Sequence, residues 1–136
     1  MPASTEQLRS IPLFSELSDD ALEAVAEIAA EVSVPAGDVL IRPYDPGLGM
    51  YVIEEGEVVV ELDDREVRLG AGEFFGELAL LIPEGIRVAR VRAVTDVRCL
   101  VIGRDDFGGL LDTEPAISVA MLPVLARRLA YEIRSH

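Results

Sequence analysis

The sequence predicts one α+β, mainly β, domain in which short antiparallel strands form a roll or sandwich between helices at both ends. Apolar residues follow helical spacing in the first part of the chain and again after Asp105. Between these parts, apolar and polar residues alternate in short runs that glycines separate. The 136 residues suit a single core, so we expect one domain over 1–136, with helices in 1–33, strands in 34–104 and helices in 105–136.

Two helices are predicted before the strands. Ser4 or Thr5 can cap a short helix that runs through Leu8, and Ser18 followed by two acids is typical of a second helix start. Apolar residues at helical spacing then continue as far as Val32. We therefore expect the second helix to extend almost to Val34.

The strand region is divided by turns. Two β-rich runs flank Glu55 and Gly56, and the pair Asp63 and Asp64 marks another reversal. Several of the glycines in this region are expected at tight corners with positive φ or at backbone crossings.

One predicted strand, 87–95, carries an unusual charge. Alternation places Arg87 on the same face as Ala89, Val91 and Ala93. A guanidinium at the end of an apolar row is costly to desolvate unless an anion meets it there. Arg90 and Arg92 fall on the other face, where solvent exposure and loose ion pairing explain them.

A sequence that can supply the anion's other contacts precedes this strand. Gly76 permits close approach, and the amides that follow it can bind an anion at the start of a one-turn helix. Glu77 repels phosphate, but its carboxylate can accept hydrogen bonds from sugar hydroxyls. Phosphate beside ribose indicates a nucleotide.

Helices are predicted again after the last strand. Asp105 or Asp106 can begin one that runs through Leu111, and Pro115 suits the first turn of another. Pro123 interrupts the pattern, so we expect a kink or break there and a separate helix from Val124.

Composition excludes several classes of function. A formal net charge of −13 opposes direct binding to nucleic acid or to an anionic membrane. The chain has no lysine, and His136 is its only histidine, so a P-loop, a His-based metal site and a Ser/His/Asp site are all excluded. Cys99 lies in an apolar run and is expected to be buried. We expect a cytoplasmic, non-catalytic protein without a metal or cofactor, and with no membrane span.

Several segments, in order and nearly end to end, resemble one family, the cyclic nucleotide-binding domain of catabolite-type regulators, kinase regulatory subunits and ion channels. The segments are LFSELSDDALEAVA, VPAGDVLIRPYDPGLGMYVIEEGEVVV, RLGAGEFFGELALL, RVARVRAVTDVRCLVIGRDDFGGLL and LARRL. The resemblance implies an antiparallel β-roll of the double-stranded β-helix or jelly-roll type, flanked by N-terminal and C-terminal helices.

The resemblance also implies roles for a phosphate-binding cassette at 75–91. Arg87 would pair with the cyclic phosphate and Glu77 would take the ribose 2′-hydroxyl. The backbone around Leu78 and Ala79 would complete the phosphate site. The remaining ligand-binding positions implied are Gly76, Val88 and Ala89.

The sequence departs from the family pattern at three places. Val88 replaces the usual serine, threonine or alanine after the arginine, and the lack of threonine favours cAMP over cGMP. Pro43-Tyr44-Asp45 replaces Gln-Gly-Asp. Glu132 and Ile133 stand where bacterial regulators place two hydroxyl residues against the base. Tyr131 is a candidate base lid, although packing explains it equally well.

Three functions are weighed on this basis. The leading one is a non-catalytic sensor for cyclic nucleotide, cAMP favoured and cGMP second, which relays its signal by movement of the C-terminal helices. The alternative is a ligand-free β-roll that serves as a protein-interaction or dimerisation module, and a cupin-type enzyme is the third. Expected partners are an effector protein or a missing output domain, since only seven residues follow LARRL, and a second copy. The second copy would pair through the row Leu122, Leu125, Leu129 and Ile133.

Overall fold

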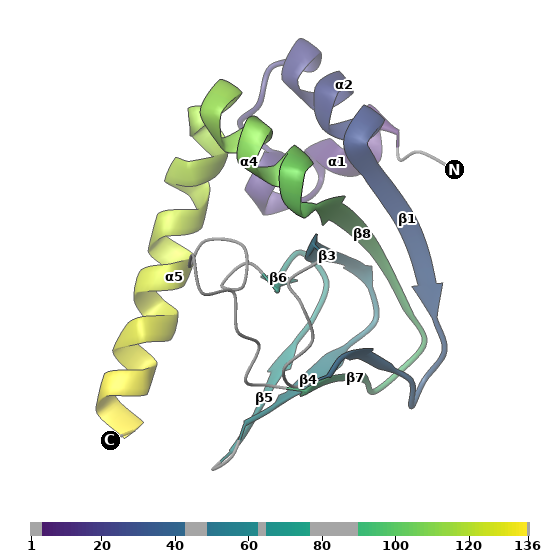
Figure 1. Cartoon of the computed structure of the whole chain (residues 1–136), viewed down its shortest axis with the longest axis vertical. Coiled ribbons are helices and arrows are strands. Elements are labelled where there is room, and N and C mark those ends of the chain that lie inside the picture. The colour runs from purple at the N-terminus through teal and green to yellow at the C-terminus, as the bar shows by residue number, and fades with distance from the viewer. Residues whose placement is uncertain (1–3, 43–48, 63–64, 77–89, 136) are drawn as a thin grey trace.

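The chain folds as two four-stranded antiparallel sheets with helices before and after them (Figure 1). The structure is a computed structural model that describes residues 4–42, 49–62, 65–76 and 90–135, without the side chains of 131–135. The helices are α1 (Thr5–Arg9), η1 (Pro12–Phe14), α2 (Asp19–Ile28), α4 (Arg104–Thr113) and α5 (Pro115–Ser135). The strands are β1 (Ala29–Val34), β2 (Val39–Ile41), β3 (Gly49–Glu55), β4 (Val58–Glu61), β5 (Glu66–Leu69), β6 (Phe74–Phe75), β7 (Arg90–Ala93) and β8 (Val97–Gly103). The predicted fold class is confirmed.

The first two helices begin where their capping residues predict. The Ser4 hydroxyl accepts a hydrogen bond from the Gln7 amide at 3.2 Å, while the Gln7 side chain accepts one from the Ser4 amide at 2.9 Å. Ser18 caps α2 through the Ala21 amide at 3.2 Å. These bonds satisfy amides that have no partner within the helix.

The end of the second helix was predicted wrongly. The helix stops at Ile28, and Ala29 already begins β1, so the strands start earlier than Val34. All six residues of β1 pair with β8. Pairing with a central strand therefore overrides the helical spacing of the apolar residues as far as Val32.

The two sheets have the strand orders β1-β8-β3-β6 and β2-β7-β4-β5. Strands β4 and β5 form an antiparallel pair, which confirms the reversal predicted near Asp63 and Asp64, two residues outside the described part. Gly56 has φ +96° and carries the chain from β3 in the first sheet to β4 in the second. A Cβ atom there would lie 2.3 Å from the Asp96 carbonyl oxygen, so glycine is required at this corner.

The first sheet is buried on both faces. On β8, Leu100 and Ile102 face the helices, whereas Val97 and Cys99 face the second sheet. Cys99 is buried as predicted, and burial raises the pKa of its thiol to about 11. Figure 1 shows α1, α2 and α4 gathered at one end of the sheets, while α5 runs alongside them.

The predicted break at Pro123 is wrong, because α5 is one helix from Pro115 to Ser135 with Pro123 inside it. Pro123 is exposed, whereas Met121 is buried and Leu125 packs against the same core. Packing on both sides of the proline holds the helix together.

Within the described ranges, no single helix is long and apolar enough to span a membrane. The helix α4 and residues 115–130 of α5 reach the required length and apolar composition only together, across a 107° bend.

Candidate functional site

The short strand β6 leads into the predicted site. It pairs with β3, with Phe74 opposite Val52 and Phe75 opposite Tyr51. Phe74 packs in the core under the helices, and Phe75 lies between the two sheets. The rings of Tyr51 and Phe75 stack with centroids 4.9 Å apart and planes 5° apart. Both faces of β6 are therefore fixed by packing.

Gly76 follows β6 directly, with φ +88°. This left-handed conformation favours glycine over any residue with a Cβ atom. Gly76 is the one predicted ligand-binding residue within the described ranges. The other predicted positions, Glu77, Leu78, Ala79, Arg87, Val88 and Ala89, lie outside them, as does the side chain of Tyr131.

The far end of the same segment is fixed by β7 in the second sheet. Val91 and Ala93 are buried between the sheets, with 3% and 0% exposure. Arg90 and Arg92 lie on the opposite face, where their Nε atoms are 3.3 and 3.5 Å from Glu61 Oε1. This alternation and this ion pairing confirm the prediction for the described part of the strand. Residues 77–89 thus connect the end of β6 in one sheet to the start of β7 in the other.

Arg128 joins the C-terminal helix to the start of the site. Its Nη2 atom donates a hydrogen bond to the Phe74 carbonyl oxygen at 2.5 Å, and its guanidinium lies over the Phe74 ring, 4.7 Å from the centroid. The contact between Arg128 and Phe74 was not predicted from the sequence. One signal was available, since Arg128 follows Val124 and Leu125 at helical spacing on the face that packs against the core.

A second group of charges, which the sequence analysis missed, lies under the N-terminal helices. Arg98 on β8 approaches three carboxylates, with distances of 3.6 Å to Glu31, 3.8 Å to Glu54 and 3.3 Å to Glu55. Burial and the neighbouring Glu31 raise the pKa of Glu54, Arg98 opposes this rise, and Glu55 adds to it. Among the described residues, no cluster of His, Cys, Asp and Glu side chains is suited to a metal ion.

Comparisons with known proteins agree with this architecture. A family model described as a cyclic nucleotide-binding domain matches residues 31–114. A cyclic nucleotide-gated potassium channel of Rhizobium etli is 39% identical over 80% of this chain and 30% of its own length. A cAMP-dependent protein kinase regulatory subunit of Emericella nidulans is 36% identical over 76% of this chain and 26% of its own length.

A solved structure of similar fold is the Thermus thermophilus catabolite activator protein. It has a TM-score of 0.78 and 29% identity, over 91% of this chain and 61% of that chain. The chain spans about a quarter to a third of the length of the curated relatives that it matches. The family resemblance predicted from the sequence is confirmed.

Proposed function

The chain belongs to the cyclic nucleotide-binding domain family, and on this premise we propose that it is a non-catalytic sensor that binds cAMP in preference to cGMP. The observation that carries the proposal is the family match over 31–114, which includes the whole predicted cassette at 75–91. Arg87 is proposed to hold the cyclic phosphate and Glu77 the ribose 2′-hydroxyl. Amides around Leu78 and Ala79 are proposed to complete the phosphate site.

The described ends of the cassette support this assignment. Gly76 leaves β6 with a positive φ, and β7 enters the second sheet with Val91 and Ala93 turned to its interior. If the alternation of β7 continues backwards, Arg87 shares that interior face. A guanidinium there needs an anionic partner, and a cyclic phosphate is one that accepts two of its hydrogen bonds.

The strength of the proposed contact can be estimated. A charge-assisted hydrogen bond contributes ~1.5–3 kcal/mol, which is about ten- to a hundredfold in affinity. Arg87→Ala should therefore abolish tight binding. The proposed preference for cAMP rests on Val88, which replaces the threonine that the family resemblance associates with cGMP.

The proposed output is a movement of α4 and α5. Because α5 is continuous through Pro123, the proposed hinge is Glu114, which separates α4 from α5 with φ −128° and ψ 76°. Arg128 binds the carbonyl of Phe74 just before the cassette. A ligand that repositions the cassette would therefore bias the position of α5 directly. Tyr131 stays the proposed base lid.

A thermal-shift titration tests ligand binding. A ligand that binds only the native state raises its stability by RT ln(1 + [L]/Kd), which is ~2.7 kcal/mol when the ligand is at about a hundred times Kd. We expect cAMP to raise the unfolding temperature at lower concentration than cGMP. No shift at about millimolar concentration of either nucleotide would favour the alternative, a docking module.

The alternative is favoured by one described feature, an exposed apolar row on α5. Val119, Leu122 and Leu129 are 65%, 63% and 62% exposed, whereas Leu125 packs against the core. The spacing of this row suits a helix-to-helix contact, so we propose that α5 pairs with a second copy. Light scattering with the double variant Leu122→Glu/Leu129→Glu tests this, and a monomeric parent protein would contradict it. We also propose that the chain acts on an effector protein or on a separate output domain, and that it is located in the cytoplasm.

A further inference from the structure

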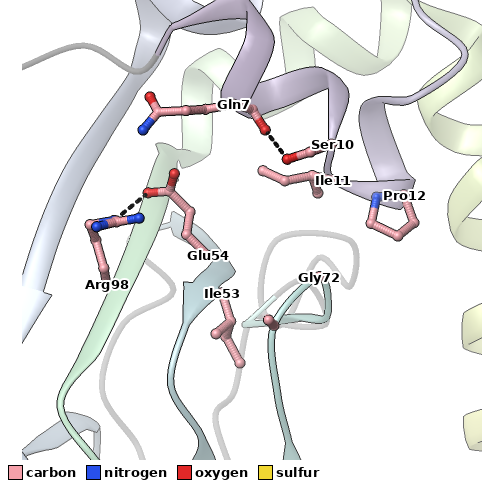
Figure 2. A pocket seen from close by; sticks show the side chains of 9 residues that line it. Gln7, Ser10, Ile11, Pro12, Ile53, Glu54, Gly72 and Arg98 are labelled. Atoms are coloured by element: carbon pink, nitrogen blue, oxygen red, sulfur yellow. Dashed lines mark hydrogen bonds and ion pairs between the residues drawn. The ribbon is translucent and has the colours of Figure 1, made fainter.

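A cavity of about 420 Å³, partly open to solvent, lies between the N-terminal helices and the outer face of the first sheet. Ser10, Ile11 and Pro12 line it from the side of the helices, and Ile53, Glu54 and Arg98 line it from the strands. Figure 2 shows the side chains of Glu54 and Arg98 directed toward one another across neighbouring strands, below Gln7 and Ser10. None of the described residues that line the cavity is one of those proposed to bind the nucleotide.

The charged pair lies where apolar rows end. On β3, Met50 and Val52 are buried under the helices, and Glu54 is the next residue on that face. On β8, Arg98 has the same relation to Leu100 and Ile102. The register shifts between Ile53 and Glu55, which places this irregularity beside the cavity.

The pair is too far apart to satisfy its own polar atoms. Glu54 Oε1 and Arg98 Nε are 3.8 Å apart, which is longer than the donor–acceptor distance of a hydrogen bond. The Glu54 side chain is only 6% exposed. Its Oε1 atom and Arg98 Nε are both buried, and neither has a hydrogen-bond partner in the part of the chain that the structure describes. Such atoms are rare in native proteins, and the Glu54 Oε1 atom calls for a hydrogen-bond donor.

The local charge identifies the kind of partner. The guanidinium of Arg98 also lies 3.6 Å from Glu31 and 3.3 Å from Glu55. Together with Glu54, three carboxylates therefore surround one guanidinium. Burial of Glu54 and repulsion from the two other acids both favour an additional cation over an anion. Arg9, on α1, pairs with Asp19.

We propose that this cavity binds a small protonated alkylamine, whose ammonium group pairs with Glu54 and whose hydrocarbon part packs on Ile11 and Pro12. The Ser10 hydroxyl donates to the Gln7 carbonyl oxygen at 2.6 Å and keeps its acceptor capacity for an ammonium proton. The volume of the cavity lies within the ~300–1,000 Å³ of small-molecule sites. Cyclic nucleotide binding is not required for this inference.

Amide NMR titrations with three probes of one size test the proposal. We expect butylammonium to cause saturable shifts at Ser10, Ile53 and Gly72, while butanol and butyrate cause none. The shifts should persist with saturating cAMP, because the two proposed sites share no residue. Without any variant, the affinity for butylammonium should fall as the pH is lowered through the pKa of Glu54, because a neutral carboxyl does not attract a cation.

Two matched variants distinguish a specific contact with Glu54 from a general attraction of the cation to the negative charge of the region. Glu54→Gln should weaken butylammonium binding at least about tenfold, the effect of one charge-assisted contact. Glu55→Gln removes an equal charge near Arg98 from a side chain that is 67% exposed, and its effect should be below about threefold, because exposed charges are screened. The proposal is overturned if no shift saturates, if butanol binds equally well, if cAMP abolishes the shifts, or if the two variants behave alike.

Discussion

Replacing Arg128 with methionine tests how firmly the C-terminal helix is held at the start of the nucleotide site. Methionine keeps a long flexible stem and a high helix propensity, so the substitution removes mainly the guanidinium. The guanidinium donates to the Phe74 carbonyl at 2.5 Å and lies 4.7 Å from the centre of the Phe74 ring. The same substitution at the exposed Arg127 is a matched control on the neighbouring position.

The expected loss can be worked out from these two contacts. A hydrogen bond from a charged donor contributes ~1.5–3 kcal/mol, and a cation–π contact contributes ~0.5–1 kcal/mol at partly exposed sites. Arg128 is only half-buried, so solvent screening reduces the sum. We expect Arg128→Met to lower the free energy of unfolding by about 1.5–3 kcal/mol and Arg127→Met to change it by less than about 0.5 kcal/mol.

Urea unfolding followed by far-UV circular dichroism measures both changes. Amide hydrogen exchange adds a local measurement, since protection around Val124 should fall in Arg128→Met and stay unchanged in Arg127→Met. Equal stability and equal protection in the two variants would refute the conclusion that Arg128 fastens α5 to β6.

Three further outcomes follow from burial and backbone geometry. The pKa of Glu54 is raised above 4.5, chiefly by burial, so ionisation of this carboxyl destabilises the fold as the pH rises, and Glu54→Gln should stabilise the fold at pH 7 by about 1 kcal/mol. In thermal melts over a pH series this difference should disappear below pH 4.5, whereas a difference that is constant with pH would contradict the assignment. Cys99 is fully buried, with a pKa of about 11, so labelling by a thiol reagent at pH 8 should occur only through unfolding, and rapid labelling of the native protein would show the burial to be wrong. Gly56→Ala should lower the free energy of unfolding by at least ~2 kcal/mol, because it combines a positive φ with a backbone clash. Gly108→Ala, at an open helical position, should raise it by ~0.5–1 kcal/mol, and urea titrations in which both variants behave alike would contradict this.

Local signals in the sequence predicted well wherever one residue decides the structure. Ser4 and Ser18 cap helices as expected, and the alternation around Val91 holds in β7. These features depend on neighbours in the sequence, so the sequence is sufficient to find them.

Features that depend on distant partners were missed. Pairing with β8 converts the segment from Ala29 into a strand, and packing on the core carries α5 through Pro123. The contact of Arg128 with Phe74 joins residues 54 positions apart. The buried carboxylate of Glu54 could not be anticipated either, because its burial depends on α1 and η1 covering the end of β3.

Calorimetric titration of cAMP into the parent protein, into Arg87→Ala and into Arg90→Ala tests the central claim most directly. Arg90 is exposed on the outer face of β7 and serves as the matched control. We predict that Arg90→Ala binds as the parent does and that Arg87→Ala loses about ten- to a hundredfold in affinity. Equal affinity for cAMP in the parent protein and in Arg87→Ala would contradict the account.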